Sequence, residues 1–485
     1  MNGGGTLYRA GFVIGHDGDT HRIIADGAVL VRGNRVDYVG PARDFSGASD
    51  ETVHLPNHMI MPGLVNLHCH TTGAPLSRSL LEDSGNPAFF MSGLYDYGRF
   101  RKTDSEETRE VIRYSLAELL KSGATTIVEV GGSDYVDVYR ESGIRTYLAP
   151  SYRSAAWDTP DGKKLEYVWD EEAGLAGLER AVDFVSAHPS GEDLIGSMLA
   201  PAQVDTCTPE LLRESRRAAD ELGCRLHIHT SQSHTEVGVM IQRHGGSSLE
   251  FLEGLGILGP DVILAHTILT ADHPDSNIPW CRDGQILETS GASIAHCPWV
   301  FGRRGTVMHS LGQYVRRGVN VGIGTDTFPQ NMLAEMRWAA ILSKTADNNP
   351  LSATAGTAFD AATVGGARAL GREDLGRLSE GARADMVFVD CLSFDMVPVR
   401  DPIRNLVYGG SKSSVDKVMV DGKMLVDGGR VLLWDEDRLA VRVQEIAEKM
   451  WDGASARDPL GRSPDDLSPP TYPFGWTEDA GGDEA

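Results

Sequence analysis

Gly63-Leu-Val-Asn-Leu-His-Cys-His70 is an apolar run that ends in two histidines, and four other stretches of the chain share this layout. Each of them ends on a histidine or an aspartate where a strand would pass into a loop: residues 224–229, 262–266, 292–296 and 321–326. In a parallel barrel, the carboxyl ends of the strands converge on one rim. The pattern therefore predicts that imidazoles and a carboxylate gather in one small volume, as in a metal site.

The spacing of the first two histidines supports this prediction. Side chains alternate faces along a strand, so His68 and His70 should point one way, and Leu67 and Cys69 the other. Two imidazoles about 7 Å apart along a strand can chelate one ion. His227-Ile-His229 has the same spacing, and we expect only the second histidine, nearer the rim, to be a ligand. A single His-x-His pair is common by chance, but the ordered set is not.

The order of apolar runs predicts the fold. From residue 61 to 371, strand-like and helical runs alternate; residues 108–121 have helical spacing and residues 125–131 read as the next strand. This alternation predicts a (β/α)8 TIM barrel, and hairpin-like strands at both ends predict a small composite β-sandwich built from both termini. The expected boundaries are 1–60 and 372–435 for the two parts of the sandwich, 61–371 for the barrel, and 436–485 for a C-terminal helix and a Gly/Pro/Asp-rich tail.

Composition limits the choice of partners. The 485 residues are 41% hydrophobic and 24% charged, enough for one large barrel plus a smaller unit. A formal net charge of −24 disfavours binding to nucleic acids and to anionic membrane surfaces, so a small-molecule substrate is the expected partner.

The chain is expected to be cytoplasmic. No apolar stretch approaches the roughly 20 residues that a membrane span needs, and the first residues do not read as a signal sequence. The six cysteines are scattered without paired spacing, which indicates reduced thiols rather than a disulfide framework.

Several motifs carry a resemblance to a known family. Met61-Pro-Gly-Leu-Val-Asn-Leu-His-Cys-His70 looks like the opening metal motif of the amidohydrolase superfamily, and His227-Ile-His-Thr-Ser-Gln-Ser-His-Thr-Glu-Val237 looks like its third-histidine segment. Further stretches match in order at residues 259–266, 293–298, 319–326 and 378–389. From about residue 10 to about 435, the chain resembles the branch that contains triazine hydrolases and cytosine, guanine and S-adenosylhomocysteine deaminases.

The resemblance implies a barrel with a composite β-sandwich and one divalent ion. Zinc is the expected metal, with iron, cobalt or manganese as alternatives, and the matching ligands are His68, His70, His229 and Asp326. Residues 194–201 contain no lysine that could be carboxylated to bridge two ions, so we expect a single metal. Relatives are commonly dimers or tetramers, and a homodimer or homotetramer is expected here.

The ligand types predict the chemistry. Three neutral imidazoles and one carboxylate leave a dication with net positive charge and an open position, which lowers the pKa of bound water from about 16 to near 7. Asp326 is the predicted proton acceptor, and His266 is predicted to polarise the substrate or to act as a secondary ligand. The predicted catalytic residues are therefore Asp326 and His266, together with Gln232.

Gln232 is the main departure from the family pattern. Deaminases of this branch carry a glutamate there that shuttles a proton to the ring nitrogen, which an amide cannot do. The first hypothesis is therefore hydrolysis of a C–N or related acyl bond in a small aromatic or apolar amide, urea, carbamate or thiocarbamate, as in phenylurea or thiocarbamate hydrolases. The alternative is a deaminase or dechlorinase of a triazine, purine or pyrimidine. A non-catalytic relative is a third class, but the intact ligand set favours an enzyme.

Other residues are candidates for substrate contact or for the surface. His296, Trp299 and Phe89 are the predicted substrate-binding residues, because an imidazole and two apolar rings near the rim suit an aromatic substrate. His234 and Glu236 fall at the start of a predicted helix, where a solvated face is the default expectation and a proton relay the alternative.

Overall fold

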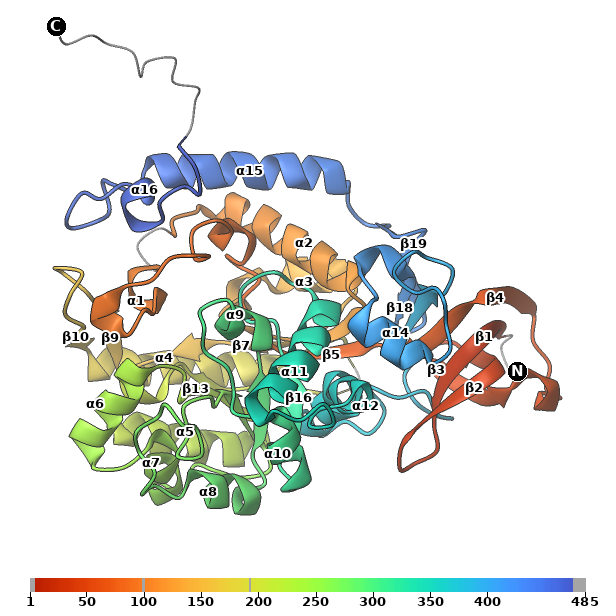
Figure 1. Cartoon of the computed structure of the whole chain (residues 1–485), viewed down its shortest axis with the longest axis horizontal. Coiled ribbons are helices and arrows are strands. Elements are labelled where there is room, and N and C mark those ends of the chain that lie inside the picture. The colour runs from red at the N-terminus through yellow and green to blue at the C-terminus, as the bar shows by residue number, and fades with distance from the viewer. Residues whose placement is uncertain (1–4, 98–100, 192, 474–485) are drawn as a thin grey trace, which may run out of the picture.

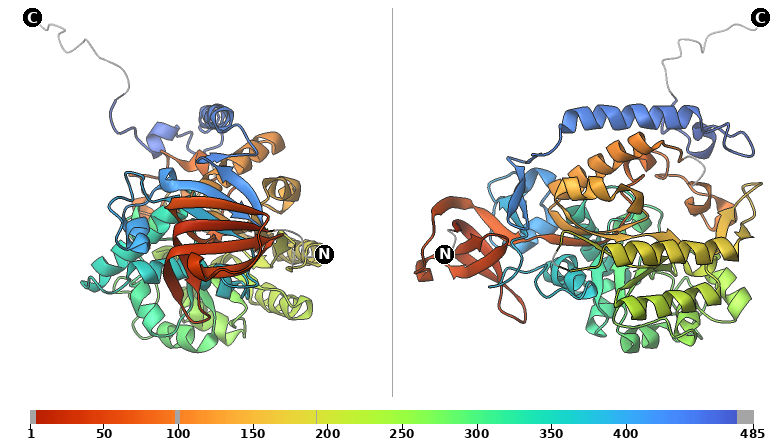
Figure 2. Two further views of the ribbon diagram at one scale, coloured as in Figure 1. Left: turned by 90° about the vertical axis from the view of Figure 1, so that its right-hand side faces the viewer. Right: turned by 180° about the vertical axis from the view of Figure 1, so that it is seen from behind.

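The computed structural model describes residues 5–97, 101–191 and 193–473 and has a mixed α/β architecture (Figure 1). Strands from both ends of the chain form one eight-stranded sheet in the order β20-β19-β18-β17-β4-β1-β2-β3. Figure 2 shows these early and late strands side by side at one end of the molecule. Their bounds are β1 Thr6–His16, β2 His21–Arg32, β3 Arg35–Pro41, β4 Glu51–Pro62, β17 Met386–Asp390, β18 Val415–Val420, β19 Lys423–Asp427 and β20 Arg430–Val431.

Two four-stranded parallel sheets hold the segments that the sequence singled out. One has the order β11-β7-β6-β5 and the other β13-β14-β15-β16. Their bounds are β5 Leu64–Cys69, β6 Ala124–Val130, β7 Arg145–Ala149, β11 Ile195–Ser197, β13 Leu226–Thr230, β14 Val262–His266, β15 Ser293–His296 and β16 Val321–Ile323. Shorter strands pair apart from these sheets: β8 Ser151–Tyr152 with β12 Ala200–Pro201, and β9 Ala155–Asp158 with β10 Glu166–Trp169.

Isolated bridges connect the two parallel sheets at both of their outer edges. Cys69 of β5 bridges Asp326 in the parallel sense, and the Asp326 amide donates to the His68 carbonyl at 2.9 Å. On the other side, Leu199 bridges Leu226, and the His227 amide donates to the Leu199 carbonyl at 2.9 Å. The first strand of one sheet and the last strand of the other therefore meet where the histidine and aspartate side chains emerge.

The end of β5 departs from regular pairing. Its register with β6 shifts between Asn66 and Cys69, and the Nε2 atoms of His68 and His70 both lie 3.6 Å from Asp326 Oδ1. The buried Asn66 amide oxygen accepts from the His68 and Thr325 amides, at 3.2 and 3.1 Å, while its nitrogen donates to the Thr325 hydroxyl at 2.8 Å. One side chain thus ties the irregular strand to the loop that carries Asp326.

Helices surround the parallel strands, and their ends follow sequence signals. α2 (Ser105–Lys121) begins with a capping box formed by Asp104 and Glu107. α15 (Glu436–Asp452) lies along α2 (Figure 2) and agrees with the helix predicted from residue 436. The remaining helices are α1 Leu94–Tyr97, α3 Val136–Ser142, α4 Glu171–Ala187, α5 Pro209–Leu222, α6 His234–His244, α7 Ser248–Gly254, α8 Asp283–Ser290, α9 Pro298–Gly302, α10 Leu311–Arg316, α11 Met332–Asp347, α12 Ala355–Asp360, α13 Gly366–Ala369, α14 Pro402–Tyr408 and α16 Pro464–Leu467.

None of the helices in the described part of the chain combines the length and apolar character needed to span a membrane. The C-terminal tail was expected to be a linker, an arm or disordered. Within residues 453–473 it contains α16, and Leu467 packs against a cluster that includes Val111 of α2 and Ile446 of α15. The part of the tail from 474 to 485 lies outside the described residues.

A buried ion cluster joins the eight-stranded sheet to β7. Arg145 is 1% exposed and donates to Asp385 at 3.3 Å and to Asp421 at 3.1 Å. Arg383, also 1% exposed, donates to Asp421 at 2.9 Å. Buried guanidinium and carboxylate groups require one another, because either charge alone in the interior is strongly unfavourable.

Replacing Arg145 by Met should lower the free energy of unfolding by about 3–5 kcal/mol, because Asp385 and Asp421 would lose a buried counter-charge. Urea-induced unfolding measures the change. Arg140→Met on the neighbouring α3 removes an exposed guanidinium and serves as the control. Equal stability of the two variants would contradict a structural role for the cluster.

Candidate metal centre

Four imidazoles and one carboxylate from both parallel sheets meet in one place. His68 and His70 come from the end of β5, His229 from β13, His266 from the end of β14, and Asp326 from the loop after β16. The Asp326 Oδ1 atom lies 3.6 Å from the Nε2 atoms of both His68 and His70, and its Oδ2 atom lies 4.0 Å from Nε2 of His266. These separations are too long for direct hydrogen bonds, and they leave space for an ion between the groups.

Backbone carbonyls fix the tautomers of two of these histidines. His70 Nδ1 lies 2.9 Å from the Val130 carbonyl, and His229 Nδ1 lies 2.6 Å from the Ala202 carbonyl. A carbonyl only accepts, so both Nδ1 atoms carry the proton and both neutral rings present an Nε2 lone pair. These two Nε2 atoms lie 3.4 Å apart. Two facing lone pairs repel one another unless a cation lies between them, so the donor set fits a divalent metal.

His68 completes the donor set and is itself held from behind. Its Nε2 atom is buried and has no hydrogen-bond partner among the described residues, as expected of a metal-ligand atom. Its Nδ1 atom lies 3.2 Å from Nε2 of His227, whose ring is also fully buried. His227 therefore orients His68, which agrees with the expectation that His229 and not His227 belongs to the ligand set.

Burial keeps these histidines neutral. It lowers the pKa of His229 to about 4, and it lowers the pKa values of His68 and His266 well below 6.5. The neighbouring imidazoles add to this effect, because His70 lowers the pKa of both His229 and His68. Neutral imidazole is the form that binds a metal, so the site has the protonation state that a metal requires at pH 7.

The backbone around the site is strained. Asp326 has φ = 55°, His266 has φ = 75° and Thr267 has φ = 49°, all in the left-handed region that residues with a Cβ rarely adopt. Such residues persist where the surroundings force them, and they cluster at functional sites. Here they turn the strand ends so that the side chains of His266 and Asp326 face the cluster.

A cavity with a volume of about 160 Å³ opens above the cluster. His266, Asp326 and Gln232, the three predicted catalytic residues, all line it. The other lining residues are His70, Gly73, Ala74, Leu81, Leu94, Arg101, Gln203, His229, Phe301, Arg304 and Thr327. Arg101, Gln203 and Arg304 were not expected, because each lies in a loop that carries no recognisable motif.

Glu236 holds the loop that carries Gln232. Its carboxylate accepts the Ser231 amide at 2.6 Å, the Gln232 amide at 3.0 Å and the Ser248 hydroxyl at 2.8 Å. Glu236 is 1% exposed, so the default expectation of a solvated helix face was wrong for this residue. Burial, with Asp205 nearby, raises the pKa of Glu236 to about 8.

The predicted substrate-binding residues are not among those that line the cavity. Phe89 packs against Tyr95 with ring centres 5.3 Å apart, and Trp299 packs against Trp338 at 5.4 Å. Neither is among the residues that line the cavity, and neither is His296, which is buried at the end of β15. Substrate contacts by these three residues remain predictions. Phe301, two residues after Trp299, does line the cavity, with its ring 4.7 Å from that of His266.

Comparison with known proteins identifies the class. Residues 59–425 match the model of the Amidohydrolase family, and the match spans both parallel sheets and all residues of the metal centre. The chain therefore belongs to the amidohydrolase family. It is an enzyme that hydrolyses carbon–nitrogen bonds other than peptide bonds.

Individual relatives cover nearly the whole chain. It is 30% identical over 439 residues to a 5-methylthioadenosine/S-adenosylhomocysteine deaminase of Moorella thermoacetica, which covers 88% of this chain and 96% of the relative. Among solved structures, an adenosine deaminase from Xanthomonas campestris with bound zinc has a TM-score of 0.79 at 25% identity, covering 92% of this chain and 98% of that one. Atrazine chlorohydrolase from Arthrobacter aurescens complexed with zinc has a TM-score of 0.78 at 26% identity, covering 91% and 100%.

Replacing His227 by Leu should weaken metal binding by about 10–100-fold, because His68 would lose the group that orients it. Competition with a chromophoric chelator measures the affinity. His244→Leu, at an exposed position on α6, is the matched control and should leave the affinity unchanged. Identical affinities for the two variants would exclude the proposed support of His68.

The metal-free protein should lose stability in mild acid. The pKa of His229 is about 4 in the folded protein and about 6.5 when exposed, so the unfolded chain binds more protons between these values. The free energy of unfolding therefore falls as the pH falls from 6.5 towards 4, and His68 and His266 add to the slope. Melting temperatures across this range measure it. His229→Gln should flatten the dependence, and an unchanged slope in that variant would contradict the assignment.

Proposed function

We propose that this chain is a metal-dependent deaminase that removes an amino group from an N-heterocycle of the purine type. The observation that carries the proposal is the pair of facing Nε2 atoms of His70 and His229 beside Asp326, at the base of a cavity. Relatives that act on adenosine derivatives support this substrate class over the acyl compounds suggested by the sequence.

We infer that the two parallel sheets are the halves of one (β/α)8 barrel, accompanied by a β-sandwich domain built from both termini. The bridges of Cys69 to Asp326 and of Leu199 to Leu226 lie where such a barrel would close. The structures similar to this chain over more than nine-tenths of its length support the same architecture. In that architecture the site lies at the carboxyl ends of the strands, where barrel enzymes hold their active sites.

One divalent ion, with zinc as the proposed metal, would be held by His68, His70, His229 and Asp326. When bound, such an ion polarises the substrate and lowers the pKa of coordinated water from about 15.7 to about 7. Two of the solved structures similar to this chain contain zinc, which supports the choice of metal.

The side chains of the cavity then have separate tasks. The Asp326 carboxylate accepts the proton of the attacking water, because its oxygens lie within 4.0 Å of the Nε2 atoms of His68, His70 and His266, beside the space where the water would be held. His266 faces the same space from the end of β14 and stabilises the charge that develops on the heterocycle. The Gln232 side chain donates a hydrogen bond to a ring nitrogen and holds the ring in place, without transferring a proton.

The proton of the leaving amine must come from another group than residue 232. Of the described residues that line the cavity, Asp326 is the one carboxylate, so the proton it takes from water is the one available to the departing ammonia. A single carboxylate can accept this proton from water and then donate it to the leaving amino group, so no second acid is needed to form ammonia. It predicts slower deamination than in an enzyme with a second carboxylate at position 232.

Hydrolysis of an amide, urea, carbamate or thiocarbamate is the second candidate function. The amide of Gln232 in the cavity favours it, because an acyl carbon needs no protonated ring nitrogen to accept a nucleophile. In this case His266 would polarise the acyl oxygen, and Asp326 would return the proton to the leaving group.

A substrate panel separates the two candidates. Metal-loaded protein should release ammonia from adenosine, 5′-deoxyadenosine or 5-methylthioadenosine, detected by a coupled ammonia assay, and the deaminated base should appear by mass spectrometry. Turnover of aryl ureas and carbamates without any deamination of these purines would overturn the proposal in favour of the second candidate. Turnover that survives complete removal of the metal would exclude both.

Replacing Gln232 by Glu should raise deamination of aminopurines by about 10²-fold, the lower range of a positioned acid–base group. The comparison of kcat/KM between the variant and the parent measures the gain. Gln203→Glu adds a carboxylate elsewhere on the cavity wall and is the matched control. Equal gains from both substitutions would show that added charge alone, and not a proton shuttle at position 232, causes the effect.

A further inference from the structure

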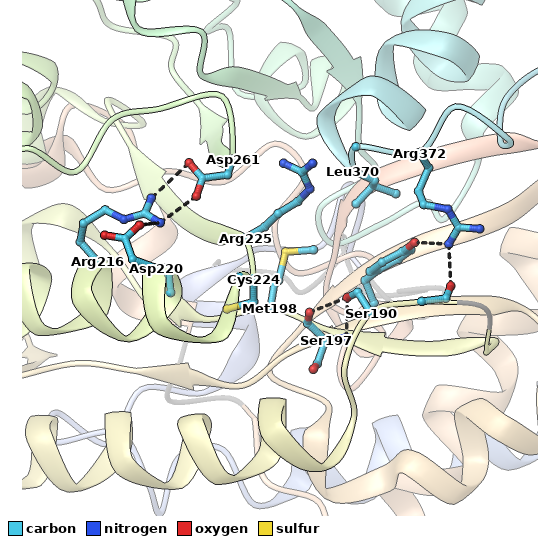
Figure 3. A pocket seen from close by; sticks show the side chains of 15 residues that line it. Ser190, Ser197, Met198, Arg216, Asp220, Cys224, Arg225, Asp261, Leu370 and Arg372 are labelled. Atoms are coloured by element: carbon cyan, nitrogen blue, oxygen red, sulfur yellow. Dashed lines mark hydrogen bonds and ion pairs between the residues drawn. The ribbon is translucent and has the colours of Figure 1, made fainter.

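A second cavity, shown in Figure 3, has a volume of about 510 Å³. Its lining residues Arg225 and Asp261 lie at the amino ends of parallel strands, whereas the metal centre lies at the carboxyl ends. Arg225 directly precedes β13, whose fourth residue is His229, and Asp261 directly precedes β14. Four residues of extended strand separate Arg225 from His229 by about 13 Å. The two cavities are therefore distinct, and nothing in the proposed chemistry uses the second one.

Three guanidinium groups line this cavity, and two of them form ion pairs with carboxylates. Arg216 donates to Asp220 at 2.6 Å and to Asp261 at 2.7 Å, as the dashed lines in Figure 3 show. Arg372 pairs with Asp374 at 2.8 Å and also donates to the Tyr147 hydroxyl at 2.9 Å. Two carboxylates line the cavity, Asp220 and Asp261, and both form ion pairs with Arg216.

Arg225 is the exception. No carboxylate of the described residues lies within 4.0 Å of its guanidinium, and its hydrogen bond in the structure goes to the Pro260 carbonyl at 3.3 Å. Burial lowers the pKa of Arg225 even though Asp261 acts in the opposite direction, whereas carboxylate partners raise the pKa values of Arg216 and Arg372. A partly buried guanidinium that makes no direct ion pair is a binding group for an anion, because pairing would recover its lost hydration.

The chain provides room for this cation. Gly371 lies against it with φ = 64°, and a Cβ atom at this position would lie 1.9 Å from the Nη2 atom of Arg225. Any other residue at position 371 would push the guanidinium out of its place. The close approach therefore depends on glycine for both the space and the backbone conformation.

The rest of the wall supplies one further donor and an apolar surface. The Tyr147 hydroxyl accepts from Arg372, and its own hydrogen has no acceptor among the described residues. Met198, Ala219 and Leu370 add apolar atoms to the lining. The Ser190 hydroxyl already donates to the Ser197 carbonyl and accepts its amide, so it offers no donor to a ligand.

We propose that this cavity binds a small organic oxyanion, with Arg225 as the charged anchor, Tyr147 as a hydroxyl donor, and the apolar wall as the surface for the body of the ligand. A carboxylate and a phosphate monoester both carry two or more oxygen acceptors on one central atom. A guanidinium recognises this arrangement in either group. The site is separate from catalysis, and because it binds the folded chain, its ligand stabilises the protein.

Calorimetric titration of the metal-loaded protein at constant ionic strength tests the proposal, with inorganic phosphate and benzoate as the two probes. At least one of them should bind saturably, and its Kd should rise by about tenfold or more in Arg225→Gln. Arg217→Gln removes an exposed guanidinium from the same helix as Arg216 and should leave the Kd unchanged. Preference for benzoate or for phosphate identifies the headgroup.

Two further variants keep the test decisive. Arg225→Lys retains the charge without the planar fork and should bind the probe with intermediate affinity, even if Arg225→Gln folds poorly. Tyr147→Phe should weaken binding several-fold by removing one donor. Equal probe affinity in the parent and the Arg225 variants would place the anion elsewhere, for example at the metal centre, and would overturn the proposal. Absence of saturable binding of both probes to the parent protein would overturn it as well.

Discussion

The arrangement of the metal centre depends on two imidazole nitrogens whose lone pairs face one another. His70 and His229 each donate their other ring hydrogen to a backbone carbonyl, of Val130 and Ala202, so neither ring can turn its tautomer to relieve the contact. Their Nε2 atoms are 3.4 Å apart at the base of the cavity. A cation between the two nitrogens would remove the repulsion between their lone pairs. The same ion would therefore stabilise the local fold and supply the chemistry.

Much of the scaffold serves to keep that arrangement in place. Asn66 ties the irregular end of β5 to the loop of Asp326, and His227 supports His68 from below. The left-handed backbone at His266 and Asp326 would be unfavourable in isolation and is maintained by the strand ends around it. These supports come from different strands, so the geometry of the site depends on the two parallel sheets being held together.

The sequence predicted the shared sheet of early and late strands, the α15 helix and the gathering of histidines, because apolar periodicity and strand-end residues are local patterns. It did not reveal Arg101 and Arg304 on the cavity wall, since loops bring them there without a motif. It also misjudged Glu236. A glutamate at the start of a helix is usually solvated, and only the tertiary fold shows that this one accepts three hydrogen bonds in the interior.

The buried carboxylate of Glu236 has an evolutionary consequence. It fixes the main chain at Ser231 and Gln232, so the side chain at position 232 can change between amide and acid without rebuilding the loop. Glutamine and glutamate codons differ by one base, and the two side chains have nearly the same shape. The proposed change between a hydrogen-bonding amide and a proton-transferring acid at position 232 would therefore require a single nucleotide change and no rearrangement of the loop.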